Sequence, residues 1–145
     1  MRRVFSVGVV LLLGFGIFST PVSAQSGSGN RGGFQLEQNF PNPFNPTTRI
    51  PFTLGEELFR DGRPVVVTIR VYNVLRQLVA VPTALEHPSG NATPVDHLEY
   101  TVPGRHEAYW DGLDKDGRKV ASGLYFVLMW VNGEQGPPIR VTVKK

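Results

Sequence analysis

The chain has 145 residues, no cysteine and a formal net charge of +3. The lack of cysteine excludes disulfides, thiolate metal sites and a lipid-bearing cysteine at a processed N-terminus. Basic residues are scattered, and removing Arg2 and Arg3 with the N-terminal segment leaves a net charge near +1, so no nucleic-acid role is expected.

The N-terminus has the order of a secretory signal peptide. A basic start is followed by an uncharged apolar run, Val4–Phe18, which is shorter than the roughly 20 residues that span a bilayer. Val22-Ser23-Ala24 is a small-x-small cleavage pattern, so we predict a signal peptide over residues 1–24, cut between Ala24 and Gln25. An uncleaved anchor is the alternative. Residues 25–33, rich in serine and glycine, are expected to form a flexible leader, and residues 34–145 one folded domain.

The folded region opens with a proline-rich strip, residues 38–47, in which asparagines and aromatics alternate with three prolines. Each proline biases the preceding residue towards extended backbone, here Phe40, Asn42 and Asn45. We expect Phe40 and Phe44 to be pinned under a sheet while the asparagine amides bond nearby backbone. Such a strip would seal one end of a β-sandwich.

Alternation of apolar and polar residues predicts the strands that follow. The expected strands are residues 49–54, 65–72, 77–81, 97–102, 105–110 and 139–144. The second of these has one apolar and one mixed face, which favours a position in the middle of a sheet. Long unpatterned stretches at Gly55–Pro64 and Thr83–Pro94 are expected to be surface loops.

Residues 124–131 are apolar at every position, which predicts a central strand covered on both faces. A buried helix is the rival interpretation, but Ser122-Gly123 and Asn132-Gly133 bracket a segment of strand length. The whole pattern predicts an all-β, antiparallel, immunoglobulin-like β-sandwich of about seven strands with no helix. Strand order does not follow from the pattern, and Trp110 and Trp130 are expected in the core.

The acidic cluster Asp111, Asp114 and Asp116 only partly resembles a calcium loop. An EF-hand needs oxygen ligands at loop positions 1, 3 and 5 and a glycine at position 6, but a loop that starts at Asp114 has Arg118 fifth and Lys119 sixth. A hairpin in which Asp and Gly satisfy turn geometry is the favoured interpretation, with a weak calcium site as the alternative. No metal and no cofactor are predicted.

The other polar residues assemble no catalytic set. His87 lies in a loop and His97 on an outward face, and His106 is expected to be partly buried and bonded to backbone, with a ligand or base role as its alternative. Ser122 is not in a nucleophile elbow. Asn91-Ala92-Thr93 matches a glycosylation acceptor, a triplet that is common by chance.

Six segments in order carry a family resemblance that covers residues 36–145. The chain resembles the type A C-terminal sorting domain of the type IX secretion system, itself similar to the immunoglobulin-like domain of flagellar hook-capping proteins. The motif residues are Asn39, Pro41, Asn42, Pro43, Phe44, Asn45, Pro46, Tyr72, Asn73, Leu75, Gly104, Trp110, Asp111, Gly112, Gly117, Ser122, Gly123 and Tyr125. Two departures stand out. Arg76 replaces the glycine usual in that turn, which makes a positive φ costlier and suggests a rebuilt turn. The stretch of residues 81–103 is longer than the corresponding stretch usual in the family.

The resemblance implies a non-enzymatic, secreted module that is recognised by the outer-membrane translocon and, in many members, cleaved by a sorting peptidase. Its expected location is the cell surface or the medium, with the periplasm in transit. The last strand, with Val141, Val143, Lys144 and Lys145, is the expected recognition element, because an unpaired edge offers backbone hydrogen bonds. The alternative is a surface module that binds protein or glycan through the 83–94 loop. A small hydrolase is the third reading, and it would need a pocket joining His106 to Asp111 or Asp114.

Overall fold

The computed structural model describes residues 32–145, so the signal peptide predicted over residues 1–24 and most of the 25–33 leader lie outside the described part. Within it, ten strands and one 3₁₀ helix follow one another and no α-helix forms, which confirms the all-β prediction. Gly33 is buried, and its carbonyl accepts a hydrogen bond from the Gly55 N–H. None of the helices in residues 32–145 has the length and apolar character to cross a bilayer.

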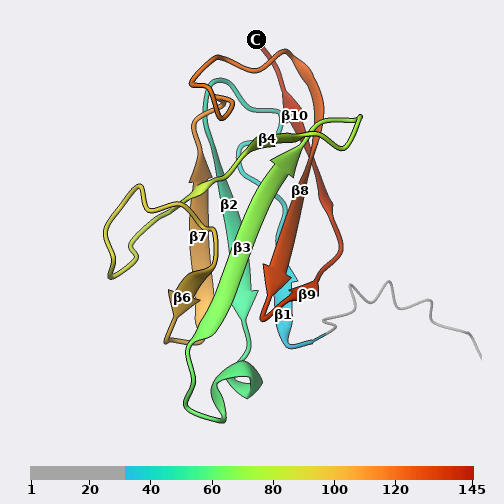
Figure 1. Ribbon diagram of the computed structural model, residues 1–145. Helices are drawn as coiled ribbons and strands as arrows, with labels where there is room; N and C mark the ends of the chain where they lie inside the picture. The colour runs from blue at the N-terminus through green and yellow to red at the C-terminus, as the bar shows by residue number, and fades with distance from the viewer. Residues whose placement is uncertain (1–31) are drawn as a thin grey trace, which may run out of the picture.

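The strands form two antiparallel sheets that face each other (Figure 1). One, called sheet A here, has the order β1-β2-β7-β5. Its strands are β1 (Phe34–Leu36), β2 (Thr48–Leu54), β5 (Thr83–Ala84) and β7 (Gly104–Trp110). Sheet B has the order β10-β8-β3-β4, with β6 paired to β3 and β9 to β8. Its strands are β3 (Val65–Tyr72), β4 (Leu78–Ala80), β6 (Leu98–Tyr100), β8 (Gly123–Val131), β9 (Glu134–Gln135) and β10 (Ile139–Val143).

The long alternating segments became the strands that the sequence predicts. β3 pairs with β8 on one side and with β4 and β6 on the other, which confirms its position inside a sheet. β8 lies between β10 and β3, as expected for the central strand. Three short strands, β1, β5 and β9, were not predicted, and β5 falls in the 83–94 segment expected to be a loop. The 55–64 loop carries the 3₁₀ helix η1, Glu56–Phe59.

The core lies between the sheets, where inward side chains of both layers interdigitate. On β8 the inward positions are Tyr125, Val127, Met129 and Val131, so Leu124, Phe126, Leu128 and Trp130 point outward. Trp110 is 1% exposed and belongs to the core, as predicted. Trp130 does not, because its place in the two-residue period of β8 puts it on the outer face, where it is half-buried. The core residues of the long strands are Ile50, Phe52, Leu54, Val65, Val67, Ile69, Val71, Ala108, Trp110, Tyr125, Val127, Met129, Val131, Val141 and Val143.

Candidate functional site

The proline-rich strip is fastened to the start of β2 by Asn39, which is 3% exposed. The Asn39 Nδ2 donates to the Pro41 carbonyl at 3.0 Å and to the Thr48 Oγ1 at 2.9 Å. The Phe40 N–H donates to the Arg49 carbonyl and the Arg49 N–H to the Phe40 carbonyl, at 2.9 and 2.8 Å. These contacts hold the chain in the extended shape that its prolines favour.

Phe40 and Phe44 were both expected to be buried under a sheet, but they lie in different environments. Phe44 is 1% exposed, whereas Phe40 is 74% exposed and the prediction of its burial was wrong. Directly opposed residues in an antiparallel pair present their side chains on the same face. Phe40 is bridged to Arg49, which points to solvent, so Phe40 points there too.

The strip also covers the outer edge of β10. The Phe44 N–H donates to the Thr142 carbonyl and the Lys144 N–H to the Phe44 carbonyl, both at 3.0 Å. The Asn42 Oδ1 accepts from the Thr142 N–H at 3.0 Å, and the Gln38 Nε2 donates to the Arg140 carbonyl at 2.7 Å. The chain itself therefore uses the backbone groups that an unpaired edge would offer.

The last strand was expected to be recognised through an unpaired edge, but this edge of β10 is already hydrogen-bonded by the proline-rich strip. Val141 and Val143 are 0% and 7% exposed because their side chains enter the core. Lys144 and Lys145 are exposed beyond the end of β10. Of the four residues, only the two lysines present side chains to solvent.

An aromatic column joins three motif segments at this end of the sandwich. The Phe44 and Trp110 ring centroids are 5.1 Å apart, and those of Trp110 and Tyr125 are 5.6 Å apart. The Trp110 Nε1 donates to the Leu113 carbonyl, and the Tyr125 hydroxyl to the Ala121 carbonyl. A Cβ on Gly112 would clash with the Pro46 carbonyl oxygen, so only glycine permits this approach. The strip, the Trp110–Gly112 segment and the start of β8 thus form one structural unit.

The aspartates of the following loop cap turns. The Asp111 Oδ1 accepts from the Leu113 N–H, and the Asp114 Oδ1 accepts from the N–H groups of Asp116 and Arg118. The Arg118 N–H is the main cause of a lowered pKa at Asp114. These are the contacts expected of a turn. In residues 32–145 no group of three or more His, Cys, Asp or Glu side chains is placed to hold a metal ion.

Of the remaining motif residues, Tyr72, Asn73 and Leu75 lie on the β3–β4 hairpin and Gly104 at the far end of β7. Gly117 lies in the turn between Asp114 and Arg118. The Asn73 Oδ1 accepts from the N–H groups of Leu75 and Gln77 and so fixes the turn. Arg76 keeps a positive φ of 60°, so the turn is not rebuilt despite the missing glycine. Gly104 begins β7, opposite Leu54, and lies away from the Trp110 end.

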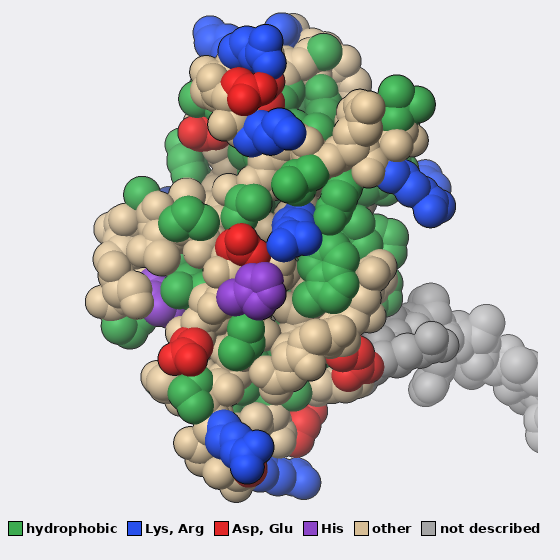
Figure 2. Space-filling view, in the orientation of Figure 1, with side chains coloured by type: hydrophobic (Ala, Val, Ile, Leu, Met, Phe, Trp, Pro, Cys, Tyr) green, Lys and Arg blue, Asp and Glu red, His purple; other side chains and the backbone are tan. Residues whose placement is uncertain are grey.

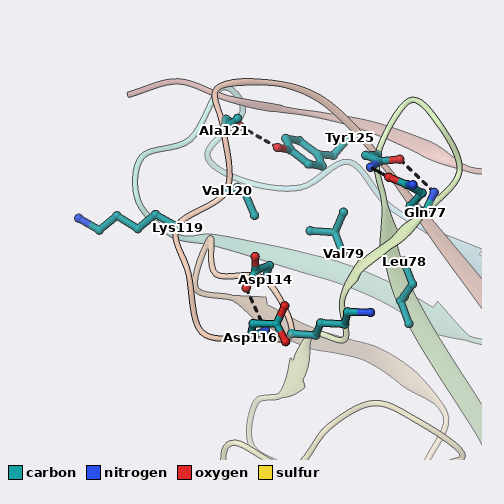
Figure 3. Close-up of a pocket in the computed structure, with 11 residues that line it drawn as sticks. Gln77, Leu78, Val79, Asp114, Asp116, Lys119, Val120, Ala121 and Tyr125 are labelled. Carbon is teal, nitrogen blue, oxygen red and sulfur yellow. Dashed lines mark hydrogen bonds between the residues drawn. The ribbon is translucent and has the colours of Figure 1, made fainter.

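A groove of about 590 Å³ lies between this hairpin and the 114–121 loop (Figure 3). Figure 3 shows Val79 and Val120 facing each other across it, with Asp114 and Asp116 at one side and Tyr125 at the other. His106 lines a different cavity, with Leu85, Glu86, Arg105 and Glu107. The structure therefore does not join His106 to Asp111 or Asp114 in one pocket.

Two of the three histidines lie beside Tyr100, and the third lies elsewhere. The His106 Nε2 bonds to the Val102 carbonyl at 2.8 Å, the backbone contact that the sequence predicts. The His87 Nε2 bonds to the Glu99 carbonyl, and the two rings flank Tyr100, with centroids 4.8 and 4.7 Å from its own. His97 lies apart from them, beside Asp96. Tyr100 is 4% exposed, and burial raises its pKa to about 12.

Sequence reasoning missed the outer face of sheet B. Across β3 and β8, Tyr72 opposes Phe126 and Arg70 opposes Leu128, and the Arg70 Cζ lies 5.7 Å from the Trp130 ring centroid. The uninterrupted apolar run of β8 was visible in the sequence, and it predicted a strand covered on both faces. Within residues 32–145 no second layer of strands packs on the outer face, where Phe126, Leu128 and Trp130 are half-buried.

Comparison with known proteins identifies the fold. No protein-family model and no curated protein matches the sequence. A crystal structure of dimeric latent PorU from Porphyromonas gingivalis is similar, with a TM-score of 0.53 and 20% identity over 76% of this chain and 9% of that one. PorZ, described as an essential bacterial surface component of the type IX secretion system of the same species, gives a TM-score of 0.44 and 19% identity over 83% of this chain and 13% of that one. The chain thus spans about a tenth of each neighbour, and at this identity the likeness to PorU shows a shared fold.

Proposed function

We propose that the chain is a non-enzymatic module for type IX export, which directs outer-membrane translocation or surface display. One observation carries the proposal: motif segments that are far apart in the sequence meet at one end of the sandwich, through Phe44, Trp110, Gly112 and Tyr125. Residues shared with the sorting family therefore build one local structure, and that structure holds the last strand. The fold shared with part of PorU is consistent with this proposal.

The proposed partners are the outer-membrane translocon and, where trimming occurs, the sorting peptidase. Because the edge of β10 is covered, recognition would rest on side chains at the C-terminus, where Lys144 and Lys145 are exposed. No cofactor is proposed. The proposed location is the cell surface or the medium, after passage through the periplasm.

Export can be tested by expressing the full chain in a type IX-competent host and in a mutant that lacks the pathway. Intact mass spectrometry of medium, surface and periplasmic fractions gives both the location and the termini. We expect pathway-dependent release or display, and an N-terminus at Gln25. Periplasmic retention in both hosts would refute the proposal.

The C-terminal lysines require a variant that keeps β10 in place, since deleting residues 140–145 would remove Val141 and Val143 from the core. The double charge reversal Lys144→Glu/Lys145→Glu leaves those residues intact. The matched control is Arg60→Glu/Arg63→Glu, in the exposed loop between β2 and β3. We expect the C-terminal variant to accumulate in the periplasm and the control to be exported. Equal export of both would exclude recognition through the lysines.

A second candidate function, a surface module that binds another macromolecule, is favoured by the apolar groove on the outer face of sheet B. The 83–94 loop, the contact that the sequence suggested, is partly committed to sheet A through β5. The outer face is therefore the stronger candidate for a binding surface.

A further inference from the structure

We propose that the outer face of sheet B binds a protein segment that carries large apolar side chains and carboxylates. The surface, called the aromatic–arginine face here, consists of Tyr72, Phe126, Leu128 and Trp130, with Arg70, Arg76 and Arg140 around them. The proposal goes beyond export, because it concerns what the folded domain holds and not how it travels.

The first feature of this face is its apolar pattern. An antiparallel sheet with one solvated face normally alternates apolar and polar residues, yet every outward position of β8 is apolar. Figure 2 looks onto this face and shows hydrophobic side chains gathered over β3 and β8, next to basic groups. Figure 1 shows no further layer of secondary structure from residues 32–145 on this side of β3 and β8. Tyr72, Phe126, Leu128 and Trp130 are half-buried, and the Arg70 guanidinium lies over the Trp130 ring. An apolar surface with a polar border is typical of an interaction site.

The second feature of this face is its shape. The β3–β4 hairpin and the segment before β10 bound a groove of about 580 Å³, with Val74, Gln135 and Pro138 among its walls. Its floor is formed by side chains of β3 and β8, and the Tyr72 and Trp130 rings are 6.5 Å apart. A walled groove of this kind can seat bulky apolar side chains.

The third feature of this face is its positive charge. Arg140 opposes Phe126 in the register of β10 and β8, so its side chain shares the face, and Arg76 lines the groove. Neither forms an ion pair within residues 32–145. Arg70 is paired with Asp96 at 3.3 Å. Two unneutralised guanidinium groups favour carboxylates, which arginine binds in a bidentate manner.

The composition also selects a protein segment over other occupants. Tryptophan, tyrosine and arginine are the residues enriched in the energetic centres of protein interfaces. A sugar needs many polar partners, but the Asn73 amide is already used by its own turn and Gln77. A second copy of this chain that docked through the same face would place its arginines against those of the first copy. Residues 1–31 contain no aspartate or glutamate, so they supply no carboxylate side chain.

The test is selection of a displayed library of random 12-residue peptides against the folded domain, residues 25–145. We expect the enriched peptides to combine Phe, Tyr, Trp or Leu with Asp or Glu. Titration of a selected peptide should increase or shift the emission of Trp130, which lies in the face. The double reversal Arg76→Glu/Arg140→Glu should weaken binding at least about tenfold. The control Arg60→Glu/Arg63→Glu, with the same change in net charge, should bind as wild type does.

Several results would overturn the proposal. They are the recovery of no peptide, enrichment without carboxylates, and equal binding by the Arg76→Glu/Arg140→Glu variant and the control. Leu128→Asp adds a second check of the apolar part, since it should abolish binding while circular dichroism stays unchanged. Face-dependent dimerisation in sedimentation, or face-dependent binding of phosphatidylglycerol vesicles or maltohexaose without acidic peptides, would assign the face to another occupant. The readout is separate from export, so either proposal can fail alone.

Discussion

Gly112 is a residue at which two motif segments approach closely, and it has a positive φ of 74°. Gly112→Ala should destabilise the domain by about 2–5 kcal/mol, because the left-handed backbone costs about 1–2 kcal/mol and the overpacking against the Pro46 carbonyl adds about 1–3. Gly117→Ala is the matched control. Gly117 has a φ of 77°, but its Cβ would meet nothing within 4 Å, so only the backbone term applies. Urea unfolding of both variants measures the difference. Equal losses would mean that the strip yields to the new methyl group.

Tyr100 predicts a dependence of stability on alkaline pH. Its pKa is raised to about 12 in the folded chain, against about 10 in an unfolded one, because burial disfavours the phenolate. The folded state therefore favours the neutral form, and this contribution is fully present below pH 10 and is lost as pH rises through 12. Relative to Tyr100→Phe, the wild type should lose stability only above pH 10.

At pH 7 the Tyr100→Phe variant should have a free energy of unfolding within about 1 kcal/mol of the wild-type value, because no group in residues 32–145 bonds the Tyr100 hydroxyl. Urea unfolding at pH 7, 10 and 11.5 gives both comparisons. Burial also raises the pKa of Tyr125. The Tyr100→Phe variant should therefore still lose some stability at alkaline pH, but less than the wild type does. A constant difference between the two proteins at all three pH values would contradict the assignment.

For single aromatic residues, the sequence predicts burial in some cases and fails in others, because burial depends on the direction in which the side chain points. Phe44 and Trp110 were placed correctly because each lies in a segment packed between the sheets. Phe40 was misplaced because its orientation depends on Arg49, a partner across a bridge that no local pattern specifies. Trp130 was misplaced because an uninterrupted apolar run does not show which half of its residues faces inward.

Among the elements, the proline-rich strip acts as an additional edge for sheet B. The Thr142 N–H on β10 donates to the Asn42 side chain, so Asn42→Ala should expose that amide. Asn45→Ala is the matched control, since Asn45 also precedes a proline in the strip, is exposed and makes no side-chain hydrogen bond within residues 32–145. We expect faster hydrogen exchange at Thr142 in the Asn42 variant alone, with a loss of about 0.5–1.5 kcal/mol. Unchanged exchange at Thr142 would show that the strip does not protect this edge.

The sequence predicts the long strands well and the shortest strands poorly. β2, β3, β7, β8 and β10 are long enough for the period of two to be visible, and they were predicted within a few residues. β5 and β9 have two residues each, and their pairing is imposed by the neighbouring strands β7 and β8. The covered edge of β10 was not predicted, because it depends on side chains 100 positions away, such as Asn42 on Thr142.

For the whole molecule, the two outer faces of the sandwich differ in kind. The face of sheet A carries a ladder of exposed ion pairs, Glu37–Arg105–Glu107–Arg49, which contribute little each but keep that side hydrated. The face of sheet B is apolar with free cations. One side is therefore suited to solvent and the other to a partner, although both sheets contribute residues to the core.

This asymmetry predicts how the two tryptophans of the chain respond to quenchers. Trp110 is 1% exposed, while Trp130 is half-buried beside Arg70 on a face that attracts anions. Iodide should quench part of the emission, caesium should quench less of it, and Trp130→Phe should remove the quenchable part. Adding salt should reduce the difference between iodide and caesium, since screening weakens the attraction. Equal quenching by the two ions at low salt would mean that the arginines do not set the potential at this face, and that a carboxylate partner has no electrostatic reason to choose it.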